Sequence, residues 1–333
     1  MSSDGIVKVI NALPISKLIS TVSAGIGKMY EPRHKRKMAD ATAYEINAIG
    51  EAMRNVADMP IVYNQDGVAI NSEDFNRLMQ RAGTRLVLQE TIKQHNIESV
   101  VDNAYEMLEK EERCSAEPVE QGWINRFFDS VADISDEDLQ QLWGKVLAGE
   151  IKQPNSYSLR TLETLKNLSK YEAELFNKIS PYIVNMDGSL FVTSNTELLK
   201  KHGITYGEIM QLDECGLMNS AGLVSLNPKV SDSQCVAIYN SSKIALICGL
   251  DSNIITVSIG EFGLTRAGKE LFQLLDATPN DEFIHDFIEK IVQDNFKKIK
   301  ASVYQINYIE GNRINYDETI LCEFPAQMDK IIK

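Results

Sequence analysis

Helical periodicity is clearest in the stretch DISDEDLQQLWGKVLAGEI, residues 133–151. Its apolar residues recur three and four positions apart, which predicts a helix with one buried face. Ser135 and Asp138 form a weak capping box, and acidic residues there suit the positive end of the helix dipole. Gly149 and Pro154 end the helix. The residues expected on its buried face are Leu139, Leu142, Trp143, Val146 and Leu147.

Two further helices follow at short intervals. The first carries Leu159, Leu162, Leu165 and Leu168 at helical spacing. Ser169 and Glu172 then form a full capping box for the next helix, which Pro181 stops. Three capped helices with short turns predict a compact helical module, in which the positions expected to be structural are Leu139, Leu142, Trp143, Leu162, Leu165 and Leu168.

The N-terminal region has a different character. Residues 14–30, PISKLISTVSAGIGKMY, predict an amphipathic helix whose stripe is Ile15, Leu18, Ile19, Val22 and Ile26. A basic run follows at once, with Arg33, Lys35, Arg36 and Lys37. Residues 1–60 carry eight basic and six acidic side chains, a net +2, so the remainder carries −13 − 2 = −15. Such a helix either packs on the protein's own core or lies on an anionic membrane surface.

The next two segments are also helical by pattern. Ala39, Thr42, Ile46, Ile49, Met53 and Val56 form a heptad seam almost three repeats long. An intramolecular helical hairpin and a homo-oligomeric bundle both use such a seam. After a break at Pro60, Ser72 opens another helix, in which Phe75, Leu78 and Met79 are expected to face inward.

Composition limits the class of protein. The 333 residues suffice for about two domains. A net charge of −13 argues against nucleic acid as a partner, because phosphate neutralisation needs clustered Lys and Arg. The five scattered cysteines favour reduced thiols over a disulfide scaffold. Without a signal peptide or a long apolar run, the chain is expected in the cytoplasm, with peripheral contact at the inner membrane as an alternative.

The second half mixes helices and strands, so we expect an α+β fold. Two short helices, strand-like runs and the helix LTRAGKELFQLL (residues 264–275), capped by Thr265, resemble a winged-helix domain. A C-terminal helix and a hairpin turning at Gly311-Asn312 complete the chain. The expected domains are N-terminal helices (1–58), a helical bundle (59–180), a winged-helix-like domain (181–280) and the helix with the hairpin (281–333).

No motif of known chemistry is found. The sequence lacks a P-loop, a nucleophile elbow, a zincin motif and a dinucleotide fingerprint. His34, His95, His202 and His285 are far apart, and none pairs with Cys or Asp at metal-ligand spacing. Cys114 beside Arg113 is the one candidate for a perturbed thiol. We therefore predict no catalytic residue, metal ligand or cofactor, and rank an enzyme with a dispersed site last.

The pattern LQxLW, a short loop and LxxLxxLSxxEAxLF resembles an uncharacterised bacterial domain-of-unknown-function family with the layout of the abortive-infection alpha group. It is matched here by Asp138, Leu139, Gln140, Leu142, Trp143, Leu162, Leu165, Leu168, Ser169, Glu172, Ala173, Leu175 and Phe176. The resemblance implies a bacterial protein with phage defence by growth arrest as one role. These positions are mostly structural, so they imply shared architecture more than shared activity.

The sequence thus predicts a non-enzymatic interaction protein. Its N-terminal stripe and basic run are expected to contact a membrane or a partner, and the winged-helix-like domain to sense or hold a protein partner. Self-association is a further option. The alternative is a DNA-binding winged-helix regulator, but the expected recognition helix, residues 205–215, has three acidic residues and no Lys or Arg.

Overall fold

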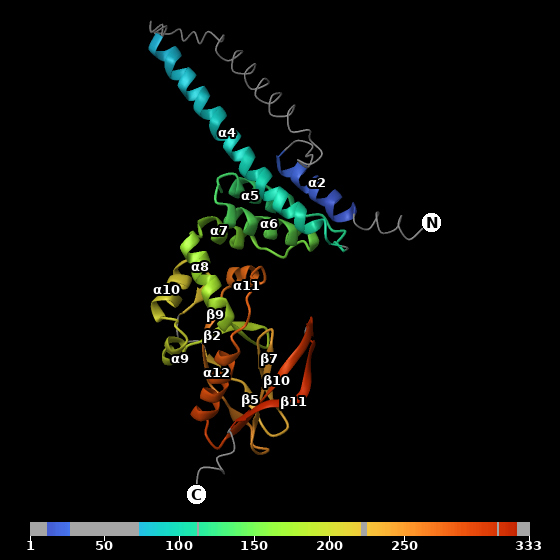
Figure 1. Cartoon of the computed structure of the whole chain (residues 1–333), viewed down its shortest axis with the longest axis vertical. Coiled ribbons are helices and arrows are strands. Elements are labelled where there is room, and N and C mark those ends of the chain that lie inside the picture. Colours follow the sequence, from blue (N-terminus) through green and yellow to red (C-terminus); the bar gives the residue numbers. More distant parts are fainter. Residues whose placement is uncertain (1–11, 27–72, 112, 221–224, 312, 325–333) are drawn as a thin grey trace, which may run out of the picture. The chain divides into compact units, whose positions relative to one another are not determined.

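The structure is a computed structural model of the chain. It describes residues 12–26, 73–111, 113–220, 225–311 and 313–324. Helices occupy the N-terminal half, and an antiparallel sheet with a β-hairpin occupies the C-terminal half (Figure 1), which confirms the predicted α+β class. The chain divides into two compact units, Met1–Leu162 and Glu163–Lys333. The predicted four-part division, with boundaries after residues 58, 180 and 280, stays a prediction.

The described part of the first unit is helical. Its elements are α2 (Ala12–Ile26), α4 (Glu73–Leu108), α5 (Gln121–Val131), α6 (Glu137–Lys152) and the start of α7 (Leu159–Asn167). The quoted stretch is α6, as predicted, but its N-cap is Asp136 rather than Ser135. The Asp136 carboxylate accepts a hydrogen bond from the Leu139 amide at 3.1 Å, so the acidic residue that favours the dipole also caps the helix.

Aromatic rings fill the core of this unit. Trp143 of α6 is fully buried, and its ring meets the edge of Phe127 on α5 at a centroid distance of 5.4 Å. Trp123 stacks on Phe127 at a centroid distance of 5.0 Å, and its indole N–H donates to the Tyr157 carbonyl at 2.8 Å. Helix α5 therefore carries the rings that join the helical layers.

Two glycines allow close helix packing. A Cβ on Gly144 of α6 would lie 2.6 Å from the Cβ of Asn103 on α4, so only glycine permits this approach. A Cβ on Gly25 of α2 would overlap the ring of Phe128 on α5. Lys17 of α2 adds a polar contact, because its ammonium donates to the Ile151 carbonyl at 2.7 Å, at the end of α6.

Helix α4 is one continuous helix of 36 residues and differs from the prediction in its first half. Leu78 and Met79 were expected to face inward, but they are 53% and 43% exposed. The prediction was wrong for these two because the first half of α4 has no described element beside it to bury them. The second half is packed, with Val100, Val101, Ala104 and Leu108 fully buried.

The second unit contains α8 (Lys170–Ile179), α9 (Thr196–Lys201), α10 (Tyr206–Glu214), α11 (Arg266–Phe272), α12 (Asp281–Asp294) and the short 3-10 helix η2 (Ser180–Tyr182). Its strands are β1 (Val184–Met186), β2 (Ser189–Thr193), β3 (Met218–Asn219), β4 (Ser225–Leu226), β5 (Lys229–Val230), β6 (Val236–Tyr239), β7 (Lys243–Gly249), β8 (Ile255–Thr256), β9 (Ile259–Leu264), β10 (Ile299–Glu310) and β11 (Arg313–Phe324).

The main sheet is antiparallel in its described pairings. Its order is β11-β10-β7-β6-β1-β2-β9-β3, with β4 also pairing with β9, while β5 and β8 form a separate pair. Helix α12 buries Phe283 and Phe287, and the latter meets Phe191 of β2 edge-on at 6.2 Å. The sheet and α12 therefore share an apolar core.

The C-terminal hairpin has the predicted position, with Gly311 in the left-handed region at φ 57°. Only the half of β10 nearest its start shows the predicted alternation of buried and exposed residues. Near the turn, Tyr308 and Ile309 are 58% and 41% exposed, so the expected buried face does not extend to the tip.

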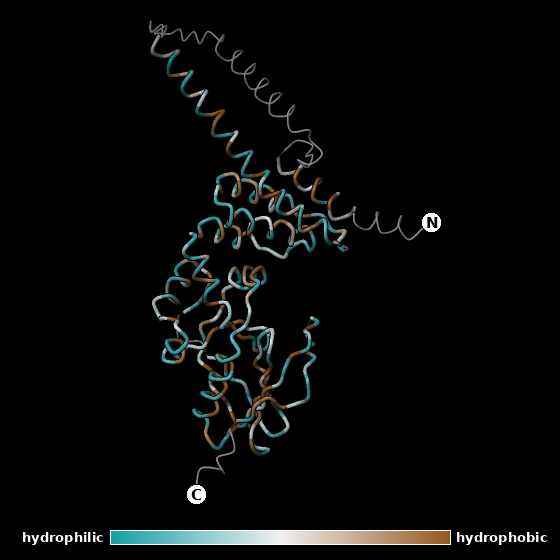
Figure 2. The backbone as a smooth tube through the Cα atoms, viewed as in Figure 1, coloured by the Kyte–Doolittle hydropathy of each residue, from teal (hydrophilic) through white to brown (hydrophobic). Residues whose placement is uncertain are grey.

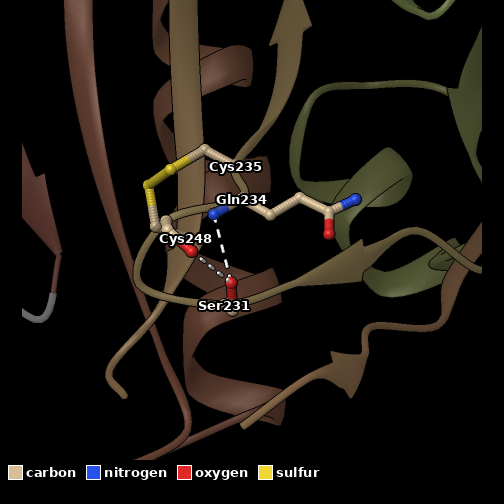
Figure 3. The surroundings of a disulfide bond; sticks show 5 residues. Ser231, Gln234, Cys235 and Cys248 are labelled. Atoms are coloured by element: carbon tan, nitrogen blue, oxygen red, sulfur yellow. Dashed lines mark hydrogen bonds between the residues drawn. A yellow bond between two sulfur atoms is a disulfide. The ribbon is translucent and has the colours of Figure 1, made fainter. Parts of the chain in front are cut away.

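Two cysteines are joined in a disulfide, which corrects the prediction of reduced thiols. Cys235 lies next to the first residue of β6 and Cys248 lies in β7. Val236 pairs with Ile247, so the two cysteines are cross-strand neighbours. Figure 3 shows the bond beside a turn in which the Gln234 amide donates to the Ser231 hydroxyl at 3.1 Å. A pairing between adjacent strands cannot be read from cysteine spacing alone. Cys114, Cys215 and Cys322 are free.

Candidate functional site

The predicted N-terminal contact residues are only partly described. Helix α2 packs against α5 and α6, with Leu18 and Val22 fully buried and Ile15 and Ile19 partly exposed. The side chain of Ile26 lies outside the described residues. The basic residues that also lie outside them are Arg33, Lys35, Arg36 and Lys37. Their role in contacting a membrane or a partner stays a prediction.

The predicted structural positions lie on helices. Trp143, Leu162, Leu165 and Leu168 are buried, and Leu139 and Leu142 are partly exposed. None of the helices in the described residues is both long enough and apolar enough to cross a membrane.

A polar cluster forms where α9 and α12 meet. The buried imidazole of His202 and the ammonium of Lys201 lie 2.8 and 2.6 Å from the same carboxylate oxygen of Asp286. Burial works against the charge of Asp286, but the hydrogen bonds from Lys201 and His202 outweigh it and lower its pKa. The cluster therefore joins two helices that are far apart in the sequence.

The same cluster contains the one group of possible metal ligands among the described residues. His285, Asp286 and Glu289 each offer a ligand atom, and these atoms lie within 4.8 Å of one another. The sequence analysis missed this set because His285 and Asp286 are adjacent and their spacing matches no metal motif. The ammonium of Lys201 already forms an ion pair with the carboxylate of Asp286, and a metal cation beside that ammonium would be repelled. We assign the cluster a structural role.

Cys114 does not have the environment of a nucleophile. Its thiol lies 3.1 Å from the Ile151 carbonyl. Burial raises the pKa of the Cys114 thiol, and the charge of Lys17 offsets this only in part. Because the thiolate is the reactive form, a raised pKa argues against catalysis by this residue.

Helix α10 presents an exposed surface on an element that is capped and anchored in the core. Thr205 caps it, and the carboxylate of Glu208 reaches back to the Thr205 amide at 2.8 Å, which completes a capping box. Ile209 and Leu212 anchor its inner side in the core. The helix is thereby fixed at its first turn and along its buried stripe.

Its outer side, together with one residue of α8, forms what we call the α10 face. The face consists of the exposed residues Tyr171, Tyr206, Gln211 and Glu214. The phenol of Tyr171, itself 58% exposed, donates to the side-chain oxygen of Gln211 at 3.2 Å and so joins α8 to α10. Tyr206 is 49% exposed, and its ring lies 5.9 Å from that of Phe262 on β9. The two tyrosines are therefore held in place while much of each ring remains open to solvent.

The acidic residues of α10 are largely committed to internal contacts. Lys178 pairs with Glu208 at 2.6 Å. Burial works against the charge of Glu208, but the hydrogen bonds from Lys178 and Thr205 outweigh it and lower its pKa. Asp213 accepts hydrogen bonds from the amide and the hydroxyl of Ser220. Glu214 alone adds charge to the α10 face, and the sequence has no Lys or Arg between Lys201 and Lys229.

Sequence reasoning had identified helix 205–215 and its lack of cations, but not the contribution of Tyr171. Tyr171 lies 40 positions from Gln211, and nothing in the local pattern of either helix indicates their contact. Tyr171 lies two positions after the capping residue Ser169, and only the tertiary structure shows what this exposed aromatic residue contacts.

The fold and this face define an α+β protein in which α10, a helix of the second unit without Lys or Arg, presents exposed aromatic residues. Residues 80–288 match the model of the DUF2806 family, described as a protein of unknown function. The match covers 209 of 333 residues (288 − 79 = 209), so the chain belongs to this family. The match shows no link to the abortive-infection alpha group. No curated protein and no solved structure matches the chain.

Proposed function

We propose that the protein is a non-enzymatic binding protein whose second unit holds a protein partner on the α10 face. The observation that carries the proposal is the pair of exposed, positioned tyrosines, Tyr171 and Tyr206, at a helix α10 that itself has no Lys or Arg. Tyrosine is enriched at protein–protein interfaces, because a rigid ring adds contact area and its hydroxyl adds a hydrogen bond.

The order of elements supports a winged-helix-like interpretation of this unit. Helix α8 is followed by β2, then by α9 and α10, and then by β3 and β9. Strand β9 pairs with both β2 and β3, so the helices α9 and α10 are inserted between strands at one end of the main sheet. In this interpretation α10 occupies the position of the recognition helix.

Charge favours a protein over DNA as the partner of that helix. DNA binding requires Lys or Arg near the phosphates, and guanine is read chiefly by arginine. Helix α10 carries Glu208, Asp213 and Glu214 and no basic residue. A DNA-binding regulator remains the alternative from the sequence, but no feature of the α10 face favours it.

The first unit enters the proposal as a second contact region. Because Leu18 and Val22 are buried, the described part of the N-terminal stripe offers only Ile15 and Ile19 to an anionic membrane surface or a partner. A cytoplasmic location and a role in phage defence by growth arrest rest on the sequence interpretation and on the resemblance given above.

A pull-down from bacterial lysate tests the α10 face. The bait is the full chain, either unchanged or with Tyr206→Ala and Gln211→Ala together. We expect a specific protein to be retained by the unchanged chain and to be lost from the double variant, because aromatic anchors supply most of the binding energy at interfaces.

Tyr308→Ala is the matched control, since Tyr308 is 58% exposed on β10. In the strand order β10 is far from β3, the strand that α10 contacts. This variant should retain the same protein. An identical set of captured proteins from all three baits would contradict the proposal. Binding of random duplex DNA that weakens steeply with salt would instead support the alternative.

A further inference from the structure

The disulfide between β6 and β7 lies on the less buried face of β7. The strands of the second unit carry many hydrophobic residues (Figure 2), and in β7 the side chains of Ala245 and Ile247 are fully buried. Side chains alternate between the two faces of a strand, so Cys248 points away from the face that Ala245 and Ile247 share. Cys248 is partly exposed, and its partner Cys235 is exposed. The bond is therefore within reach of small molecules in solvent.

A hydrogen-bonded turn fixes the backbone just before Cys235. The Ser231 amide donates to the Gln234 carbonyl at 2.8 Å, and the Gln234 amide donates to the Ser231 hydroxyl at 3.1 Å. The Ser231 carbonyl accepts from the Gly249 amide at 2.9 Å, which ties the turn to β7. In Figure 3 the disulfide and the Gln234 side chain extend in opposite directions from this turn. The turn therefore holds Cys235 in place at the surface.

Lys300 of β10 stands opposite Cys248 in the sheet. The register of β7 and β10 pairs the two residues directly. Directly opposed side chains of an antiparallel pair share one face, with Cβ atoms about 4.5–5.5 Å apart. Acidic residues of the neighbouring segments are Asp232 and Asp251 in the loops and Glu323 of β11. Because a cation stabilises a thiolate, and Lys300 is the direct cross-strand neighbour, Cys248 is the better leaving group of the two cysteines.

The three free thiols are poorly suited to react with this bond. Burial raises the pKa of Cys114, Cys215 and Cys322, which reduces the fraction of each that is present as the reactive thiolate. Cys322 is in the same sheet, but it pairs with Val303, whose side chain is on the buried face. Cys322 therefore lies on the opposite face from Cys248, and an attacking thiol has to come from solvent.

We propose that the Cys235–Cys248 bond is a site of reversible modification by a low-molecular-weight thiol. The thiolate of the small molecule attacks the Sγ atom of Cys235 and forms a new S–S bond with it. The old S–S bond breaks, and its electron pair leaves with the Sγ atom of Cys248, which becomes a thiolate opposite Lys300. The product is a mixed disulfide at Cys235. Attack by the Cys248 thiolate on Cys235 expels the small molecule and restores the original bond, so the exchange needs no other oxidant or reductant.

The modification changes the sheet at its middle. In the strand order, β6 lies between β7 and β1. The modified protein keeps the pairing of residues 236–239 with β7 but loses the covalent link beside it. A small thiol therefore acts at the point where the two halves of the main sheet join.

Mass spectrometry of the full, oxidised chain identifies the sulfur that is attacked. The probe is 2-mercaptoethanol at neutral pH without denaturant, and the reaction is stopped with acid before free thiols are alkylated. Trypsin cleaves after Lys243 and so places the two cysteines in different peptides. We expect the 2-mercaptoethanol adduct on Cys235 and the alkyl group on Cys248. The reverse placement, an even distribution, or a bond that opens only in denaturant would overturn the proposal.

The rate of opening tests the role of Lys300. Lys300→Gln should slow the reaction with 2-mercaptoethanol on the order of threefold, because the departing Cys248 thiolate loses its neighbouring cation. Lys300→Arg keeps that charge and should react as fast as the unchanged protein. Lys297→Gln removes an exposed cation from the turn before β10 and controls for general attraction of the attacking thiolate. Equal rates for Lys300→Gln and Lys297→Gln would overturn the proposal, as would a loss of rate that Lys300→Arg does not restore.

Discussion

Glu261 on β9 is a carboxylate in surroundings that disfavour its charge. It is 9% exposed, and one of its oxygens has no hydrogen-bond partner among the described residues. Burial raises the pKa of Glu261, and the charge of Lys269 opposes this only in part. The folded state therefore holds a proton that the unfolded state releases, so stability falls as the pH rises above the ordinary value of 4.5.

Glu261→Gln should thus stabilise the protein, and the gain in Tm over the unchanged protein should grow as the pH is raised from 4 to 8. An unsatisfied buried polar group costs about 1–3 kcal/mol, which sets the upper range of the effect. Thermal unfolding followed at several pH values measures it. Glu214→Gln, at an exposed position, should change little at any pH. A gain for Glu261→Gln that is the same at pH 4 and pH 8 would contradict this account.

Asp286 has the opposite behaviour, because its pKa is lowered. The stability that it contributes is present above the ordinary value of 3.8 and is lost as the pH falls through the lowered pKa of the folded state. Asp286→Ala leaves the buried ring of His202 without its acceptor and should cost about 2 kcal/mol near neutral pH. Urea unfolding measures the loss. Asp294→Ala, on the same helix but exposed, should cost less than about 0.5 kcal/mol, and equal losses would argue against a special role for Asp286.

The packing of α6 on α4 rests on Gly144. In an exposed helix Gly→Ala stabilises by up to about 1 kcal/mol. At position 144 the added Cβ would meet Asn103 at 2.6 Å and backbone atoms of Val100 and Ala104 at 3.2 Å. We therefore expect Gly144→Ala to destabilise the protein, by about 1–3 kcal/mol in the free energy of unfolding, instead of stabilising it.

Chemical denaturation measures that change, and Gly122→Ala on α5 is its control. A Cβ on Gly122 would meet only the flexible side chain of Glu120, at 3.2 Å, so this variant should be neutral or stabilising. Stabilisation by both substitutions would mean that the two helices are farther apart than described.

Elements with local signals were predictable. The capping box of Ser169 and Glu172 was confirmed in both directions, as was the cap at Thr265. Local sequence patterns failed where burial or pairing depends on segments far away in the sequence. Leu78 and Met79 have a helical pattern but no described neighbour, and Cys235 meets Cys248 only because β6 pairs with β7. The α10 face could be predicted only in part. The absence of Lys and Arg from helix α10 can be read from the sequence, whereas the contact of Tyr171 with Gln211 depends on how α8 and α10 pack.

The whole chain offers a means of observing its two units separately. Both tryptophans, Trp123 and Trp143, lie in the first unit, whereas the disulfide lies in the second. A disulfide that closes a loop of this size contributes about 3 kcal/mol. A reductant should therefore lower the Tm of the second unit, followed by circular dichroism of its sheet. The Tm of the first unit, followed by tryptophan fluorescence, should stay unchanged.

The double variant Cys235→Ser and Cys248→Ser should behave as the reduced protein does and should no longer respond to reductant. If both optical signals shift together on reduction, the two units unfold as one cooperative body. The division into two compact units would then not correspond to two independent unfolding transitions.

The link between β6 and β7 also changes how the chain responds to mechanical force. The 13-residue separation between Cys235 and Cys248 corresponds to about 44 Å of extended chain at 3.4 Å per residue. While the bond is intact, pulling the termini apart cannot release that length. A single molecule stretched under oxidising conditions should therefore end shorter by nearly this amount, and should lengthen in one step when a thiol cleaves the bond.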